Sequence, residues 1–218
     1  MAQHANTDFV PLNIAVLTLS DTRTLDSDTS GDLLIESLEA AGHYSGDRAL
    51  IQDDIYLLRS KVSQWIADPA IQAVLITGGT GFTARDTTPE AVLPLFDKQI
   101  EGYGELFRQL SFAQIGSSTV QSRAVAGVAN RTAIFCMPGS TGACRLAWGS
   151  IIQEQLDARH KPCNFVEMLS MTGTGHCKGE RKEERKEERK EKLKKELKKE
   201  LKEKSKKELK KESKGVQQ

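Results

Sequence analysis

No run of apolar residues in the 218-residue chain approaches the ~18 that a transmembrane helix requires. Residues 1–8 have neither the basic start nor the apolar stretch of a signal peptide. We therefore predict a cytoplasmic protein without a membrane partner.

Cysteine and histidine are also scarce, with four residues of each. The cysteines, Cys136, Cys144, Cys163 and Cys177, form neither a CxxC pair nor the spacing of a metal site, which favours reduced thiols. The histidines are scattered and suggest no Ser/His/Asp or Cys/His arrangement. The sequence therefore gives no support to catalysis by a serine or cysteine nucleophile.

The charge is divided unevenly, although the whole chain has a net charge of only +1. Residues 178–214 hold 19 basic and 11 acidic residues, a net charge of +8, whereas residues 1–177 carry −7. The apolar residues of this basic stretch are four leucines, too few to bury a core. The fold must therefore lie in roughly the first 170 residues.

The basic stretch repeats Glu-Arg-Lys-Glu and then Leu-Lys-Lys-Glu at a four-residue period. Such i,i+4 pairs each stabilise an isolated helix by about 0.2–0.5 kcal/mol. We expect a solvated tail that is helical or disordered. A tether to nucleic acid is an alternative that the charge permits, but interleaved acids and the lack of aromatics make nucleic acid an unlikely partner. An unnatural fusion is a further alternative.

Short apolar segments alternate with segments of helical periodicity. Strands are predicted at residues 12–19, 49–51, 72–77 and 132–137, and helices at 33–41, 55–66, 106–115 and 140–156. Thr88 and Pro89 predict another helix start, with Thr88 as the cap. Because the strands are apolar almost throughout, we predict an α/β fold of three layers, a mostly parallel sheet flanked by helices.

Polar residues follow each predicted strand: residues 20–21, 53–54, 78–81 and 138–140. The carboxyl ends of parallel strands meet at one edge of a sheet, where ligands bind in such folds. These four clusters therefore predict a ligand site at that edge.

The glycine turn Gly78-Gly79-Thr80-Gly81 is either a cradle for phosphate oxygens or a simple tight turn. Asp53 and Asp86 are either Mg²⁺ ligands or helix caps, since each lies close to a helix start. Ser122 and Arg123 could contact phosphate, although an arginine on a polar loop is more often solvated. The residues alone favour a nucleotide–Mg²⁺ site and leave the reaction undetermined.

Seven spaced segments together resemble one family. They are TLSD (18–21), DTSG (28–31), ITGGTG (76–81), RDTTPEA (85–91), GYGELFR (102–108), QSRAVAG (121–127) and MPGS (137–140). The chain resembles, from about residue 8 to residue 165, the molybdenum cofactor biosynthesis family that includes protein B and molybdopterin adenylyltransferase. Cys144-Arg145 and the segment ending at Phe165 look most like the protein B branch.

The resemblance implies a domain over residues 1–169, followed by a linker and tail over 170–218. It implies trimers or a hexamer, and adenylylation of molybdopterin by Mg–ATP with release of pyrophosphate. The product would pass to a molybdenum-insertion enzyme. A non-catalytic pterin- or nucleotide-binding protein of the same pathway is the alternative.

The resemblance also implies roles for individual residues. Asp53 and Asp86 correspond to the central aspartates of the family and would be catalytic, holding Mg²⁺ or orienting phosphates. The turn of Gly78, Gly79, Thr80 and Gly81 would hold nucleotide phosphates. The rest of the pocket would be lined by Ser20, Asp21, Ser122, Pro138 and Gly139.

Overall fold

A computed structural model describes residues 8–170, which belong to one compact unit. The predicted linker and charged tail, 170–218, lies outside the described residues except for Ser170, which ends a helix. None of the helices in the described part of the chain is long and apolar enough to span a membrane.

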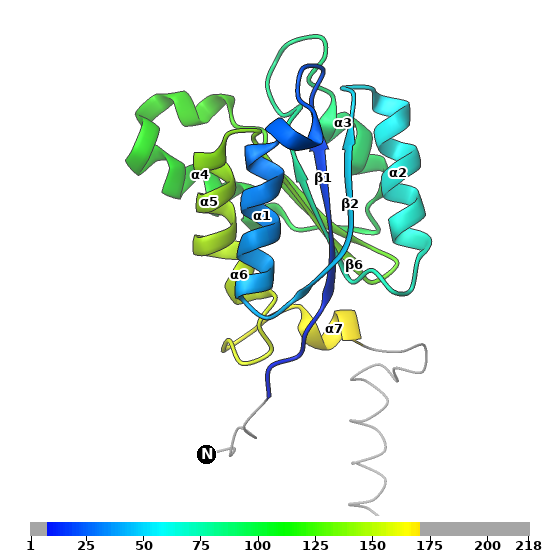
Figure 1. The fold of residues 1–218 in the computed structure, drawn as a ribbon. Helices are drawn as coiled ribbons and strands as arrows, with labels where there is room; N and C mark the ends of the chain where they lie inside the picture. Colours follow the sequence, from blue (N-terminus) through cyan, green and yellow to red (C-terminus); the bar gives the residue numbers. More distant parts are fainter. Residues whose placement is uncertain (1–7, 171–218) are drawn as a thin grey trace, which may run out of the picture. The chain divides into compact units, whose positions relative to one another are not determined.

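Six strands form one sheet at the centre of the molecule (Figure 1), in the order β2-β1-β3-β6-β5-β4. Their bounds are β1 Asn13–Leu19, β2 Tyr44–Ile51, β3 Ala73–Thr77, β4 Lys98–Gln99, β5 Val125–Ala129 and β6 Thr132–Met137. The four strands β2, β1, β3 and β6 are parallel, whereas β5 is antiparallel to both β6 and β4. The predicted mostly parallel sheet is therefore confirmed.

Two strands and half of a third were not predicted. β5 is short and contains Gly127, and it is joined to β6 by a tight hairpin in which Asn130 and Arg131 have φ of 44° and 68°. β4 has only two residues. The first half of β2 is polar and exposed because β2 is an edge strand, so it lacks the apolar signal of residues 49–51.

Helices cover both faces of the sheet. α1 (Thr29–Ala40), α4 (Glu101–Ile115) and α5 (Thr141–Ala147) pack on one face, and α2 (Ile55–Ala67) and α3 (Thr88–Val92) on the other. After α5 come a π-helical turn, Trp148–Ile152, then α6 (Gln153–Gln155) and α7 (Val166–Ser170). Short 3-10 turns span Leu25–Ser27, Leu93–Leu95 and Gly116–Gln121.

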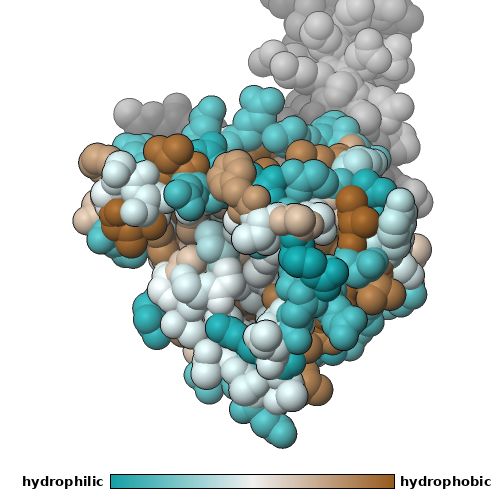
Figure 2. Space-filling model, turned by 90° about the horizontal axis from the view of Figure 1, so that it is seen from above, coloured by the Kyte–Doolittle hydropathy of each residue, from teal (hydrophilic) through white to brown (hydrophobic). Residues whose placement is uncertain are grey.

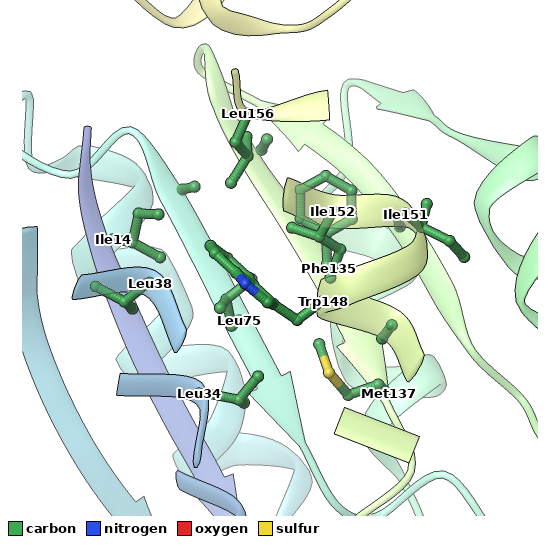
Figure 3. Packing of buried hydrophobic residues seen from close by; sticks show 14 of the residues in the cluster. Ile14, Leu34, Leu38, Leu75, Phe135, Met137, Trp148, Ile151, Ile152 and Leu156 are labelled. Atoms are coloured by element: carbon green, nitrogen blue, oxygen red, sulfur yellow. The ribbon is translucent and has the colours of Figure 1, made fainter. Parts of the chain in front are cut away.

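Alternate residues of the central strands enter two separate cores. On β3, Leu75 faces the α1/α5 core and Ile76 faces the α2/α3 core, as a strand period of two requires. Figure 3 shows the first core, where the Trp148 indole lies between the sheet and Leu34 and Leu38 of α1. Burying both faces fixes the register, and thereby the edge at which the parallel strands end.

Two of the helix starts are capped by aspartates. The carboxylate of Asp28 accepts a hydrogen bond from the Gly31 N–H and so caps α1, and Asp54 caps α2. Thr88 was wrongly predicted as a cap: it is the first residue of α3, and its buried hydroxyl donates to the Gly78 carbonyl (2.8 Å). α4 also begins at Glu101, five residues before the predicted helix.

Candidate functional site

The carboxyl ends of β1, β2, β3 and β6 enclose a cleft of about 500 Å³. It is lined by Thr18, Leu19, Ser20, Asp21, Thr22, Arg23, Asp53, Gly78, Gly79, Thr80, Gly81, Asp86, Gln121, Ser122, Pro138 and Gly139. All the pocket residues that the family resemblance implied are among them, whereas Asp54, Arg123 and Ser140 are not. Figure 2 views this edge from above and shows hydrophobic residues there as separate patches between hydrophilic and intermediate ones.

The glycine turn after β3 has a shape that side chains would prevent. Gly78 and Gly79 have φ of +105° and +61°, a region that favours glycine. A Cβ on Gly78 would lie 2.3 Å from the carbonyl oxygen of Leu19. The turn is held in place by the Gly78 N–H, which donates to the Met137 carbonyl (3.1 Å), and by Thr88. The backbone of Gly78 and Gly79 therefore borders the cleft without a side chain, and it is held in a fixed position.

Asp53 follows β2 and has an unsatisfied side chain. Its Oδ1 is buried and accepts no hydrogen bond from residues 8–170, which is unusual for a carboxylate. Burial raises the pKa of this carboxyl, and the negative charges of Asp21 and Asp86 raise it further. Among residues 8–170 Asp53 forms no ion pair, although the charge of Arg85 partly offsets those of the two aspartates.

Asp86 lies at the end of the glycine-rich loop, one residue before the cap of α3. Its Oδ2 accepts hydrogen bonds from the Thr83 hydroxyl (2.6 Å) and the Thr83 N–H (2.9 Å). The Thr83 hydroxyl is the main reason that the pKa of Asp86 is lowered. Gly81 makes room for this carboxylate, because a Cβ there would lie 2.8 Å from Oδ2. Asp86 is thus fixed and ionised at neutral pH.

Asp21, at the end of β1, is already paired. Arg85 donates to both of its oxygens, from Nε (2.9 Å) and Nη2 (2.7 Å), and this lowers the pKa of Asp21. Asp21 also accepts from the Asp53 N–H (3.2 Å). It therefore joins β1, β2 and the loop of Arg85, and leaves Asp53 and Asp86 as the carboxylates available to a ligand.

The pair Asp53 and Asp86 fits a hard cation such as Mg²⁺. The orphaned Oδ1 of Asp53 is a buried oxygen donor without a partner, and oxygen is the ligand that Mg²⁺ prefers. No group of three or more His, Cys, Asp or Glu side chains suited to a metal occurs among residues 8–170. Mg²⁺ commonly binds through one or two carboxylates, with substrate phosphates and water completing its shell.

Two arginines play parts that the sequence did not predict. Arg123 is neither solvated nor a cleft-lining residue: it donates to the Asp86 carbonyl (2.8 Å) and the Thr80 carbonyl (3.2 Å) and pairs with Glu90. It thus braces the glycine-rich loop. Arg23 lines the cleft, and the signal for it was its position two residues after the strand-end pair 20–21.

The thiols of this domain do not take part in the cleft. Cys136 and Cys144 are buried, and burial raises the pKa of both. Cys163 is exposed and free.

Comparisons with known proteins agree with this geometry. Residues 15–158 match the family model described as a probable molybdopterin binding domain. The chain is 58% identical over 160 residues to molybdenum cofactor biosynthesis protein B of Escherichia coli (strain K12), covering 73% of this chain and 94% of the relative. It is 46% identical over 142 residues to the protein of the same name from Bacillus subtilis (strain 168), covering 65% and 84%.

Solved structures give the same answer. A crystal structure of molybdenum cofactor biosynthesis protein B is similar with a TM-score of 0.66 and 42% identity, covering 70% of this chain and 94% of the other. The tungsten cofactor synthesizing protein MoaB from Pyrococcus furiosus is similar with a TM-score of 0.60 and 33% identity, covering 66% and 92%. On the matched domain, the relatives and the fold, this chain belongs to the family of molybdenum cofactor biosynthesis protein B.

Proposed function

We propose that this protein adenylylates molybdopterin with Mg–ATP and releases pyrophosphate. The observation that carries the proposal is the buried, unpartnered Oδ1 of Asp53, in a cleft that also holds the ionised Asp86 and a bare glycine turn. A buried carboxylate oxygen without a hydrogen bond is costly unless a ligand completes it. The Mg²⁺ ion of Mg–ATP would supply the missing positive charge.

The chemistry requires no protein nucleophile, in keeping with a cleft that is lined by neither cysteine nor histidine. The phosphate of molybdopterin attacks the α-phosphorus of ATP, and the bond from that phosphorus to the bridging β-oxygen breaks. Asp53 and Asp86 would hold Mg²⁺, which supplies neutralisation of the phosphate charge. The backbone of Gly78–Gly81 would bind phosphate oxygens, and the protein's main task is positioning.

The first experiment measures pyrophosphate release by the full-length protein with molybdopterin, ATP and Mg²⁺. We expect release by the unaltered protein and a loss of about 100-fold or more in Asp86→Asn, because positioned charge is removed while the shape is kept. The folded state of the variant is verified by circular dichroism.

Asp54→Asn is the matched control. Asp54 adjoins Asp53 in sequence, but it caps α2 and does not line the cleft, and asparagine caps helices equally well. We expect this variant to keep its activity. Full activity in Asp86→Asn would refute the role of that residue. Binding of both substrates without any pyrophosphate release would favour a non-catalytic pterin-binding protein instead.

The remaining parts of the proposal follow from the reaction. The adenylylated pterin would be the substrate of a molybdenum-insertion enzyme in the same pathway. ATP and molybdopterin are substrates here, and Mg²⁺ is the cofactor that we propose for Asp53 and Asp86.

A further inference from the structure

The cleft has two walls of different charge. The three carboxylates that line it belong to the ends of β1 and β2 and to the glycine-rich loop. Among the described residues that line the cleft, Arg23 carries the single positive charge. Arg23 donates to Ser30 of α1, which in turn is bonded to the turn after β6, so its guanidinium is held on the α1 and β6 side of the cleft. Arg23 therefore defines one wall, and the carboxylates define the other.

One edge of the Arg23 guanidinium is anchored. Its Nη1 donates to the Ser30 hydroxyl (3.1 Å), and Ser30 in turn donates to the carbonyl of Gly139 in the turn after β6 (2.8 Å). The Arg23 N–H donates to the Ser20 hydroxyl (3.1 Å), which fixes the backbone. Nε and Nη2 make no hydrogen bond within residues 8–170, so they are available to a ligand in the cleft.

Asp28 forms an ion pair with Arg23 but no hydrogen bond. Its carboxylate lies 3.7 Å from Nη1, beyond hydrogen-bond distance. The same carboxylate is already satisfied by Thr18 (2.7 Å), by the Gly31 N–H (3.0 Å) and by Arg48 (3.1 Å). The Asp28 carboxylate is therefore shared between Arg48 and the Nη1 edge of Arg23, and the Nε and Nη2 donors of Arg23 are left for an anion.

We propose that Arg23 binds the phosphate monoester of the pterin substrate, the group that attacks ATP. This inference rests on the proposed function. A planar guanidinium whose Nε and Nη2 are both unused can donate two parallel hydrogen bonds to phosphate oxygens. A triphosphate that carries a metal ion would bind beside the carboxylates, because they hold the metal. A phosphate monoester without a metal ion would bind beside Arg23, the positive charge among the described residues that line the cleft. Arg23 is then the residue that holds the nucleophile and distinguishes a phosphorylated pterin from one without phosphate.

The test uses the full-length protein and measures binding of molybdopterin, without ATP, by pterin fluorescence under anaerobic conditions. We expect Arg23→Gln to weaken binding by about 10- to 100-fold, the usual effect of losing charge-assisted hydrogen bonds. Arg23→Lys should restore part of the affinity. In the adenylylation assay the KM for molybdopterin should rise, while the KM for Mg–ATP stays within about twofold.

Arg48→Gln is the matched control. It removes another cation from Asp28, but Arg48 does not line the cleft. Its pterin affinity should equal that of the unaltered protein. An equal loss in both variants would overturn the proposal, because Arg23 would then act only by supporting Asp28 and the start of α1. Unchanged affinity in Arg23→Gln would overturn it as well.

The two proposals fail separately. If the unaltered protein binds molybdopterin but releases no pyrophosphate, adenylylation is refuted and Arg23 is still tested by the binding measurement. If pyrophosphate is released and Arg23→Gln binds molybdopterin normally, the function stands and the assignment of Arg23 is wrong.

Discussion

At the scale of single residues, the three aspartates of the cleft differ in what surrounds them. Asp21 is neutralised by Arg85, Asp86 is held by Thr83, and the Oδ1 of Asp53 has no partner. The sequence placed all three at strand ends or a helix start, but it could not rank them. That ranking depends on hydrogen bonds and burial, and the two ends of the Asp21–Arg85 pair are 64 positions apart.

The environment of Asp53 predicts a conflict between stability and activity. Because its pKa is raised in the folded state, the ionised carboxyl costs free energy there. This cost is absent at acid pH, where the group is protonated in both states, and it appears as the pH rises above the usual range of an aspartate. Asp53→Asn should therefore raise the Tm at pH 7 by a few degrees, since about 1 kcal/mol corresponds to roughly 2–4 °C at this size.

Thermal unfolding at pH 7 and pH 3 measures this effect, and the gain of Asp53→Asn should disappear at the lower pH. The same variant should lose adenylylation, and Mg²⁺ with ATP should stabilise it less than the unaltered protein. A lower Tm at pH 7 would show that Asp53 supports the fold in a way that we have not described.

At the scale of elements, the glycine-rich loop depends on an arginine that lies 37 positions beyond Asp86, just before β5. Arg123 joins the Thr80 and Asp86 carbonyls, pairs with Glu90 of α3, and lies 5.1 Å from the centre of the Phe82 ring. These contacts hold both ends of the segment that carries Asp86. Arg123 is therefore a positioning residue in our proposal, because it does not line the cleft.

Arg123→Ala should lower the kcat of adenylylation about tenfold or more, because Asp86 loses its fixed position. Arg123→Lys should restore little, since one ammonium group cannot replace a guanidinium that bridges two carbonyls. Steady-state kinetics and thermal unfolding measure both effects. A variant that melts earlier but keeps its kcat would assign Arg123 a purely structural role.

The elements predicted correctly are those whose periodicity follows from burial. β1, β3 and β6 are covered on both faces and read as continuous apolar runs, and the 3.6-residue pattern of α1 and α2 reflects a single buried face. β4 and the exposed half of β2 lack this signal because they lie at sheet edges. Threonine is a common helix cap, but the hydroxyl of Thr88 donates to the Gly78 carbonyl of the glycine turn instead.

At the scale of the whole molecule, exposed apolar side chains gather on one helix and the turn that follows it. Leu106, Phe112 and Ile115 of α4 and Val120 of the next 3-10 turn are 40–74% exposed. Such a cluster is a common site of association between proteins. We therefore propose that the protein self-associates, as the trimer or hexamer that the family resemblance implies.

Replacing Phe112 and Ile115 by glutamate should shift the protein towards the monomer, because buried charge without a partner opposes association. Light scattering after size-exclusion chromatography measures the mass. The control is Tyr44→Ser, which removes an equally exposed apolar side chain from β2, on another part of the surface. A monomeric unaltered protein, or an unchanged mass in the double variant, would contradict the prediction.

The cleft is assembled from segments between Thr18 and Gly139 that meet only when β1, β2, β3 and β6 are paired. No part of the sheet could bind the ligands alone, so binding is coupled to folding of the entire domain. A ligand present at 100 times its Kd would stabilise the folded state by about 2.7 kcal/mol. Proteases act on the unfolded protein, so a higher concentration of substrates would protect more of the protein from proteolysis. The amount of this protein in the cell would then rise with the supply of its substrates.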